Sequence, residues 1–275
     1  MLDTRRANVL ILVVAAVLAG CAAPREPAPL GDHSSGGGAV RFQSREVRAA
    51  SPGCGTPDTP CARLTVVLAE PTDGGSEELR ENLDTYARHW VVSHLRQHLA
   101  DDTGRSTASL DQLAAAFLAQ HRAFVEEFPD ASADWYVEIE VAPLHSTAKV
   151  ATLDLSISSY TGGAHPNTER QLVSFTVDGG RLLGTDDLTT DLDALTAVVE
   201  RRFREARELT PDEDLESAGF WLTDGRFTLP DNLGVVADGL LVHWNAYEIA
   251  PYSMGPTTAL VPVGDLDGIV TLDLW

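Results

Sequence analysis

The chain has 275 residues, and its 20 basic and 41 acidic side chains give a formal charge of −21. This length suffices for one large domain or two small ones with a buried core. The acidic balance argues against nucleic acid and anionic lipid headgroups as partners, and favours a cationic protein or divalent ions. Solubility alone is the simpler explanation of the same charge.

Residues 1–20 are predicted to be a lipoprotein signal peptide. Arg5 and Arg6 precede an apolar run at residues 9–18 that is too short to span a bilayer comfortably. The small residues before Cys21 resemble a bacterial lipobox, which implies cleavage before Cys21 and lipid on its thiol and new N-terminus. An uncleaved anchor helix is the alternative. The prediction places the protein in the bacterial cell envelope, held to a membrane by this lipid.

A flexible tether is expected over residues 21–45. Residues 22–38 are rich in Pro, Gly, Ser and Ala, so they cannot bury enough apolar surface to offset their ordering entropy. Ala22 and Ala23 stand where an aspartate often retains lipoproteins at the inner membrane. In a Gram-negative organism, we therefore expect the outer membrane, with the protein facing the periplasm.

Cys54 and Cys61 remain as an even pair in an exported chain once Cys21 is set aside. The loop between them is short enough to close on itself. We expect a disulfide rather than a metal site, because two thiolates without a nearby histidine are a poor ligand set.

Residues 46–134 are predicted to form a strand followed by two helices. The strand covers residues 64–70, and Ser76 and a site near Ser109 each precede apolar residues at helical spacing. The second helix is expected to bury the following apolar side chains: Leu113, Phe117, Phe124 and Phe128.

Residues 135–275 are predicted to form a second half that is rich in strands. Alternating apolar residues predict antiparallel strands at three places, and short apolar runs predict four more. The expected strands lie near residues 135–141, 153–157, 173–177, 220–222, 227–229, 240–242 and 259–261. Asp224-Gly225 and Asp238-Gly239 are hairpin signals between or beside the last four. A short helical segment near residue 185 and a longer helix over 192–203 separate the two groups. The fold class is therefore α+β, with antiparallel sheets packed with helices.

Two loops stand out as candidate sites. In residues 158–168, glycines permit positive φ, while Pro166 fixes its own φ and pushes His165 toward extended backbone. His165 has one of two roles. Either it takes part in chemistry, or its ring forms hydrogen bonds to the loop backbone, whose polar groups must find partners. Residues 244–256 combine three aromatics, a methionine and two prolines. This composition suits either a recognition surface or a structural loop that closes the end of a sheet.

No complete catalytic set is recognisable. There is no Gly-x-Ser-x-Gly elbow, phosphate-binding glycine loop or free cysteine nucleophile. His94 and His98 lie four residues apart, but the glutamate of the metalloprotease motif is missing. We therefore assign no catalytic residue, cofactor or metal ligand, and predict that the protein is not an enzyme. An envelope hydrolase using His165 with a carboxylate or metal is the alternative.

Two motifs together resemble the paired signatures of the RsiV C-terminal domain family (domain of unknown function 3298). They are Tyr160-Thr161-Gly162-Gly163-Ala164-His165-Pro166-Asn167 and Tyr247-Glu248-Ile249-Ala250-Pro251-Tyr252-Ser253-Met254-Gly255. Residues 183–188 fit a short family motif between them, and the likeness spans residues 135–266. Residues 46–134 resemble the divergent half that often precedes this domain, also found beside peptidoglycan deacetylases of the PdaC type. The likeness marks these binding or signature residues: Tyr160, Gly162, Gly163, His165, Pro166, Asn167, Tyr247, Pro251, Tyr252 and Gly255.

This resemblance implies a binding module. The best understood relative is an anti-sigma factor whose exported domain binds lysozyme, a strongly cationic protein that an acidic receptor would attract. With only 20 residues before Cys21 and no deacetylase domain, neither the anti-sigma nor the deacetylase activity is expected here. We expect a lipid-anchored protein that binds a lysozyme-like cationic protein or peptidoglycan. A structural lipoprotein without a specific ligand is the other alternative. We further expect Tyr160, His165, Asn167, Tyr247 and Tyr252 to lie near one another.

Overall fold

The computed structural model describes residues 38–57, 59–99, 108–130 and 133–275. The predicted signal peptide, Cys21 and the tether up to residue 37 lie outside these ranges. Within the described ranges, no helix is long and apolar enough to cross a membrane. The described residues form a five-stranded sheet, a three-stranded sheet and four α-helices, which confirms the predicted α+β class.

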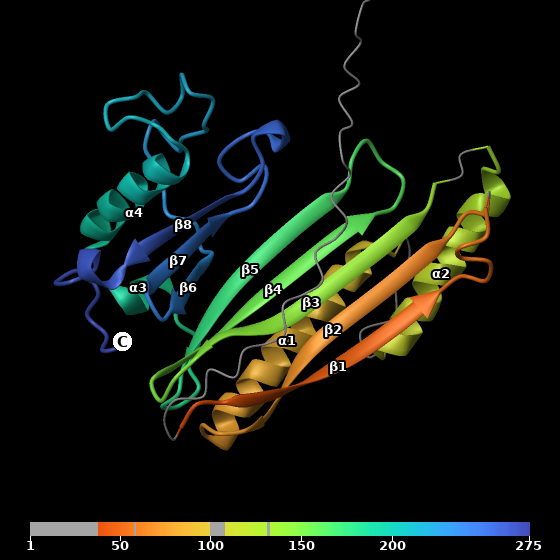
Figure 1. Ribbon diagram of the computed structural model, residues 1–275, viewed down its shortest axis with the longest axis horizontal. Coiled ribbons are helices and arrows are strands. Elements are labelled where there is room, and N and C mark those ends of the chain that lie inside the picture. Colours follow the sequence, from red (N-terminus) through yellow and green to blue (C-terminus); the bar gives the residue numbers. More distant parts are fainter. Residues whose placement is uncertain (1–37, 58, 100–107, 131–132) are drawn as a thin grey trace, which may run out of the picture. The chain divides into compact units, whose positions relative to one another are not determined.

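The larger sheet has its strands in chain order, β1-β2-β3-β4-β5 (Figure 1). Their bounds are β1 Arg41–Ala50, β2 Ala62–Asp73, β3 Trp135–Ser146, β4 Val150–Tyr160 and β5 Asn167–Thr176. The first strand begins at Arg41, inside the range assigned to the tether, and pairs antiparallel with β2. Residues 41–45 of the predicted tether therefore belong to a strand of this sheet.

Two helices cover one face of this sheet (Figure 1). They are α1 Glu77–Gln97 and α2 Leu110–Glu127, and they begin directly after Ser76 and Ser109, at the expected helix starts. Each serine accepts a hydrogen bond from a backbone N–H of the first turn, which satisfies a donor that the helix leaves unpaired. The core holds Leu113 and Phe117 as expected, but Phe128 follows the last turn and is 47% exposed.

One pairing differs from the antiparallel expectation, since β2 and β3 run parallel, with Leu64 opposite Val137. The reason lies in the connection between them. A parallel neighbour requires a crossover that carries the chain back to its starting edge, and α1 and α2 provide it. The pairs β1–β2, β3–β4 and β4–β5 are antiparallel.

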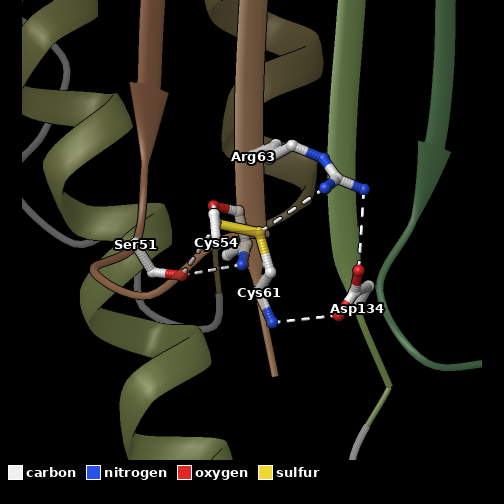
Figure 2. The surroundings of a disulfide bond; sticks show 6 residues. Ser51, Cys54, Cys61, Arg63 and Asp134 are labelled. Atoms are coloured by element: carbon white, nitrogen blue, oxygen red, sulfur yellow. Dashed lines mark hydrogen bonds and ion pairs between the residues drawn. A yellow bond between two sulfur atoms is a disulfide. The ribbon is translucent and has the colours of Figure 1, made fainter. Parts of the chain in front are cut away.

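The expected disulfide joins Cys54 to Cys61 in the connection between β1 and β2 (Figure 2). Ser51 exchanges hydrogen bonds with Ala62 and thereby closes the same connection. Asp134, just before β3, accepts a hydrogen bond from the Cys61 backbone N–H and lies 3.6 Å from the Arg63 guanidinium. The disulfide loop is thus fixed to the beginning of both β2 and β3.

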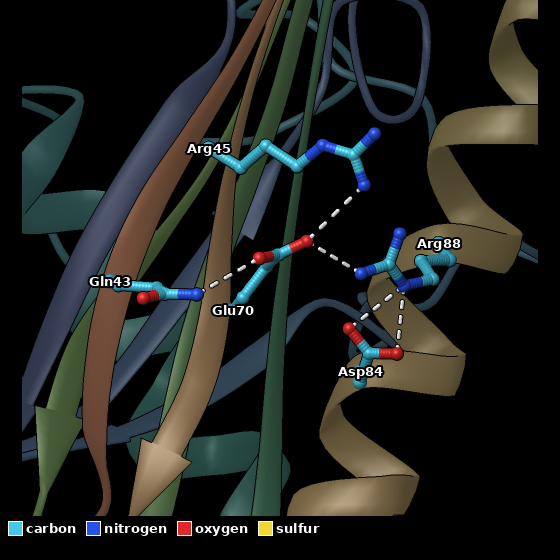
Figure 3. Close-up of polar contacts among 5 residues, drawn as sticks. All are labelled: Gln43, Arg45, Glu70, Asp84 and Arg88. Carbon is cyan, nitrogen blue, oxygen red and sulfur yellow. Dashed lines mark hydrogen bonds and ion pairs between the residues drawn. The ribbon is translucent and has the colours of Figure 1, made fainter.

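A polar network joins α1 to the first two strands (Figure 3). Glu70 of β2 accepts hydrogen bonds from Gln43 and Arg45 of β1 and from Arg88 of α1, the last at 2.6 Å. The Nε of the same Arg88 guanidinium donates to the Asp84 carboxylate. Burial acts to raise the pKa of Glu70, but the hydrogen bonds and the charge of Arg88 outweigh it, so this pKa is lowered.

The smaller sheet has the order β6-β7-β8, with both pairs antiparallel. Its strands are β6 Leu233–Val236, β7 Gly239–Trp244 and β8 Thr257–Pro262. The helices α3 Thr185–Leu188 and α4 Leu192–Ala206 precede it, and single 3-10 turns lie at Tyr252–Met254 and Val263–Asp265. A second core forms between α4 and these strands around Phe203, whose ring contacts Phe220, Phe227 and Trp244.

The prediction of strands near residues 220–222 and 227–229 is wrong, because the structure has no strand there. Phe220 and Phe227 each insert one ring into the second core, while the adjacent Trp221 and Thr228 are exposed. Only an isolated bridge joins Thr223 and Arg226 across the expected Asp224-Gly225 turn. The strand β6 was not predicted, although the Asp238-Gly239 hairpin that connects it to β7 was.

Candidate binding surface

Three rings from two distant loops meet on the surface. His165, in the loop between β4 and β5, stacks on Tyr252 with ring centroids 3.7 Å apart. The ring of Tyr247, in the loop between β7 and β8, lies 6.5 Å from that of His165 and 5.7 Å from that of Tyr252. We call His165, Tyr247 and Tyr252 the aromatic cluster. Tyr247 is 55% exposed, so the cluster is open to solvent.

Hydrogen bonds define the tautomer of the histidine in this cluster. His165 Nδ1 lies 2.8 Å from the Pro166 carbonyl oxygen, which only accepts, so Nδ1 carries the proton and donates it. Nε2 is then free to accept from the Tyr247 hydroxyl at 3.4 Å. The Tyr252 hydroxyl donates to the same Pro166 carbonyl at 2.8 Å. His165 therefore holds loop backbone and also faces the second loop.

The first loop is shaped by its own residues. Gly162 has φ +85°, a left-handed conformation that a side chain disfavours, whereas Gly163 keeps negative φ. The Tyr160 hydroxyl donates to the Gly163 carbonyl at 3.0 Å. Asn167 begins β5 opposite Ser159. Tyr160 and Asn167 thus lie at the base of the loop. Within the described ranges, no hydrogen bond or ring contact joins their side chains to the aromatic cluster.

The second loop holds Tyr247 in an unusual backbone conformation. Its φ is +70°, which is uncommon for a bulky residue and requires support from its surroundings. That support is a tight turn, in which Tyr247 N donates to the Ala250 carbonyl and Glu248 N donates to the Asn245 carbonyl. The Glu248 carboxylate accepts the Asn245 N–H in return. The turn therefore aims the Tyr247 ring outward, toward His165.

A half-buried arginine supports the other end of the second loop. Arg207, at the end of α4, donates to the carbonyls of Met254 and Gly255, both part of the turn that follows Tyr252. Its guanidinium lies 5.3 Å from the Phe220 ring centroid, and burial lowers its pKa. Gly255 has φ +69° and ends this turn. The position of Tyr252 is thus set from α4.

Two asparagines attach the second sheet and its loop to the edge of β5. Asn245 accepts the Arg170 backbone N–H at 2.8 Å and donates to the Arg170 carbonyl at 3.0 Å. Asn232, just before β6, accepts the Leu172 N–H and also donates to the Arg170 carbonyl. These side chains satisfy backbone groups that an edge strand would leave unpaired. They bring the two loops of the candidate site together.

Acidic side chains lie beside the aromatic cluster. Glu248 as a whole is exposed, yet partial burial of its carboxyl group raises its pKa, with smaller contributions from the charges of Glu169 and Asp231. Glu169 itself is 3.2 Å from His94 of α1, and this hydrogen bond lowers the pKa of Glu169. Glu248 adjoins Tyr247 in the chain, and Glu169 and Asp231 lie close enough to Glu248 to affect its pKa.

Among the described residues, no other histidine forms a hydrogen bond or ring contact with His165. His94 is buried against Trp90 and pairs with Glu169, and burial lowers the pKa of His98. His243 contacts the Thr258 hydroxyl at 2.7 Å. Burial lowers the pKa of both His145 and His243. In the part of the chain that the structure describes, no group of three or more His, Cys, Asp or Glu could hold a metal ion.

The fold and this site define a two-sheet α+β protein in which a loop of one sheet meets a loop of the other. Residues 183–264 match the family described as "Protein of unknown function (DUF3298)". The match includes the second loop and the 183–188 segment, but the loop of residues 158–168 precedes it. The segment 183–264 is thus the part of the sequence resemblance that the comparison supports.

Two solved structures share the fold. A DUF3298 family member from Bacteroides fragilis NCTC 9343 has a TM-score of 0.66 and 21% identity, covering 86% of this chain and 95% of that chain. A DUF3298 family protein from Pseudomonas aeruginosa PAO1 has a TM-score of 0.58 and 18% identity, with 86% and 96% covered. No curated protein matches the chain. At these identities the likeness shows the fold alone.

Sequence reasoning missed the residues that hold the site together. Asn232, Asn245 and Arg207 act on backbone groups far away in the chain, at separations of 62, 75 and 47 residues. An asparagine or arginine at a strand or helix end is common, and nothing in its local sequence identifies such a distant partner. The only local signal was Asn245 within the unusual 244–256 segment.

Proposed function

We propose that this chain is a lipid-anchored binding protein of the cell envelope, without catalytic activity, whose aromatic cluster contacts a cationic protein of the lysozyme type. The observation that carries the proposal is the cluster of His165, Tyr247 and Tyr252, built from two loops, in which His165 stacks on Tyr252 and Tyr247 is exposed. Aromatic side chains are frequent at the centre of protein interfaces, because they bury a large area with few rotatable bonds.

The acidic charge of the chain suits a basic partner. The chain as a whole carries a formal charge of −21, and Glu248 directly follows Tyr247 of the cluster. Opposite charge on the partner would speed association and orient it before the rings make contact. Peptidoglycan is the other partner that we propose for this surface, since envelope anchoring through Cys21 would place it within reach.

The test measures binding of hen-type lysozyme and soluble muropeptides to a chain of residues 22–275, at low salt. The variants His165→Ala, Tyr247→Ala and Tyr252→Ala should each weaken binding at least about tenfold, as expected for truncated interface anchors. Phe128→Ala is the matched control, because Phe128 is 47% exposed and lies at the end of α2.

Two outcomes would contradict the proposal. One is no binding of lysozyme or muropeptides by the unaltered chain at low salt, where attraction between charges is least screened. The other is binding by the three cluster variants that equals that of Phe128→Ala, because the cluster would then have no role in binding. Stoichiometric zinc that is lost in His165→Ala would instead favour the hydrolase alternative.

A further inference from the structure

A pocket of about 300 Å³ lies at the end of β7, where Glu248 follows Tyr247 of the aromatic cluster. Residues from three segments form its wall: 221–223, 228–231 and 244–249. The Trp221 backbone N–H donates to the Ile249 carbonyl at 2.7 Å, which fixes the first segment against the third. This volume is at the lower end of the range for small-molecule sites, roughly 300–1,000 Å³. The pocket therefore has room for one side chain or a ligand of similar size.

An exposed indole forms one side of the pocket. Trp221 is 48% exposed, whereas Trp244 of the same wall is 2% exposed and packs in the second core. Trp221 is therefore the ring that a ligand can contact. The face of an indole attracts cations, because its π-electrons place negative potential there, and a flat guanidinium also stacks on such a face.

Two carboxylates of the same wall have no cationic partner. Glu248 accepts the Asn245 backbone N–H through one oxygen, and this hydrogen bond holds the carboxylate in place. Among the described residues, no ion pair joins Glu248 or Asp231 to an arginine, a lysine or a histidine. This holds for Arg226 too, although its backbone belongs to the turn next to the wall. Both carboxylates are therefore available to a ligand.

The carboxyl group of Glu248 also lies among like charges. Burial raises its pKa, and the negative charges of Glu169 and Asp231 raise it further. The surroundings of Glu248 therefore disfavour its ionised form. A cation in the pocket relieves this repulsion, whereas a neutral ligand such as a sugar donates hydrogen bonds but brings no opposite charge, and an anion adds to the repulsion. The wall thus favours a positively charged ligand.

The wall further distinguishes between kinds of cation. A calcium ion takes about 6–8 oxygen ligands, and in the described part of the chain no group of three or more His, Cys, Asp or Glu could hold a metal ion. An ammonium group is a compact point charge without a flat face. A guanidinium is planar, stacks on an indole, and carries several N–H donors that reach carboxylates on separate segments. It alone uses both the ring of Trp221 and the two carboxylates.

We propose that this pocket receives an arginine side chain of a basic protein, with the guanidinium stacked on Trp221 and hydrogen-bonded to Glu248 and Asp231. The inference names the side chain that the cationic partner inserts, so it rests on the proposed function for the identity of that partner. Because Glu248 directly follows Tyr247, a protein that contacts the aromatic cluster also reaches this pocket. The cluster and the pocket together then form one interface.

The first measurement uses the chain of residues 22–275 and a minimal probe, N-acetyl-arginine methylamide, and follows the indole N–H signals by NMR. The Trp221 signal, identified by its loss in Trp221→Phe, should shift with a dissociation constant of about 1–10 mM, as expected for one stacked ion pair. The citrulline analogue of the probe has the same shape without the charge, and should bind at least about tenfold more weakly. The lysine analogue should fall between them, because an ammonium does not stack.

Two variants test the carboxylates with the same probe. Glu248→Gln and Asp231→Asn should each weaken binding at least about threefold, because each removes one charge that faces the guanidinium. Glu78→Gln is the matched control, since Glu78 is exposed in the first turn of α1 and does not line the pocket. It removes the same charge from the chain and should leave probe binding unchanged.

The second measurement is lysozyme binding, which separates this inference from the proposed function. Trp221→Ala should weaken it at least about fivefold, because the stacking face is lost. If the probe shifts the Trp221 signal but lysozyme does not bind, the arginine pocket is supported and the proposed partner is wrong. If lysozyme binds and Tyr252→Ala weakens it, but the probe leaves Trp221 unshifted, the pocket is wrong and the proposed function stands.

Three further results would overturn the arginine pocket. One is equal binding of the arginine and citrulline probes, and another is lysozyme binding that Trp221→Ala leaves unchanged. The third is a neutral sugar, with chitotriose as the probe, that shifts the Trp221 signal at lower concentration than the arginine probe does.

Discussion

His94 and Glu169 join the last turns of α1 to the start of β5 through one hydrogen-bonded pair. His94 Nδ1 donates to the Trp90 carbonyl at 2.8 Å, and Nε2 faces the Glu169 carboxylate at 3.2 Å. Burial acts to lower the pKa of His94, but the contacts with Glu169 and Trp90 outweigh it and raise this pKa. Glu169 thus links α1 to the same strand whose edge holds the candidate site.

The shifts predict a pH window for this pair. A raised histidine pKa gives stability that is complete below the ordinary value of 6.5 and is lost as pH rises through the folded pKa. The lowered pKa of Glu169 gives stability that is complete above 4.5 and is lost as pH falls through its folded pKa. The melting temperature lost in His94→Gln should therefore be greatest between these values and should shrink toward pH 8.5.

His89→Gln is the control for this measurement, because His89 is exposed on the same helix. Thermal unfolding of the three proteins at several pH values gives the comparison. A constant difference between His94→Gln and the unaltered protein from pH 5 to pH 8.5 would contradict the prediction.

Glu70 provides a second residue-level prediction. Its carboxylate is the acceptor for side chains of both β1 and α1, and its side chain is only 18% exposed. Glu70→Gln removes the charge that two arginines share, so we expect a loss of about 1–2 kcal/mol in the free energy of unfolding. Glu46→Gln, in an exposed pair with Arg48, should stay within about 0.5 kcal/mol. Urea unfolding measures both losses. Equal losses would show that the network around Glu70 adds nothing to the free energy of unfolding.

At the scale of elements, the features that depend on local sequence were predictable and those that depend on distant partners were not. Ser76 and Ser109 mark helix starts by their own side chains, so the positions of α1 and α2 followed from the sequence. The strand β6 contains Gly234, whose missing side chain lets the strand approach Leu172 of β5. A glycine in so short a run weakens the strand signal, and its reason is visible only in the packing.

The candidate site shows the same division. Its two loops were recognisable from their glycines, prolines and aromatics, and the structure places His165, Tyr247 and Tyr252 in one cluster. Trp221 was predicted as part of a strand, because its apolar neighbours Phe220 and Leu222 suggested one. The aromatic neighbour Phe220 in fact inserts into the core beside Phe203, and this leaves Trp221 at the surface.

The hairpin between β6 and β7 gives an element-level prediction. Gly239 has φ +150°, and a Cβ at this position would lie 1.9 Å from the Val261 carbonyl oxygen of β8. Gly239→Ala should therefore displace β8 and cost at least about 2–3 kcal/mol in the free energy of unfolding. Gly225→Ala is matched to it, because Gly225 has φ +70° but no atom near its missing Cβ, so about 1 kcal/mol is expected. Equal losses in urea unfolding would contradict the role of the contact with β8.

For the whole molecule, charge and the aromatic cluster should control different steps of binding. The formal charge of −21 acts at a distance, before contact, whereas the rings of the cluster act only once the partner is bound. If lysozyme is the partner, its association rate should fall steeply as salt rises from about 0.05 M to about 0.5 M. Its dissociation rate should change much less.

Tyr252→Ala separates these two contributions in one surface-binding experiment. The substitution leaves every charge in place, so the salt dependence of the association rate should match that of the unaltered protein. The dissociation rate should rise at least about tenfold, because the ring that stacks on His165 is gone. A variant that instead associates slowly and dissociates at the original rate would show that the cluster guides the encounter. In that case the charge of the chain would serve solubility.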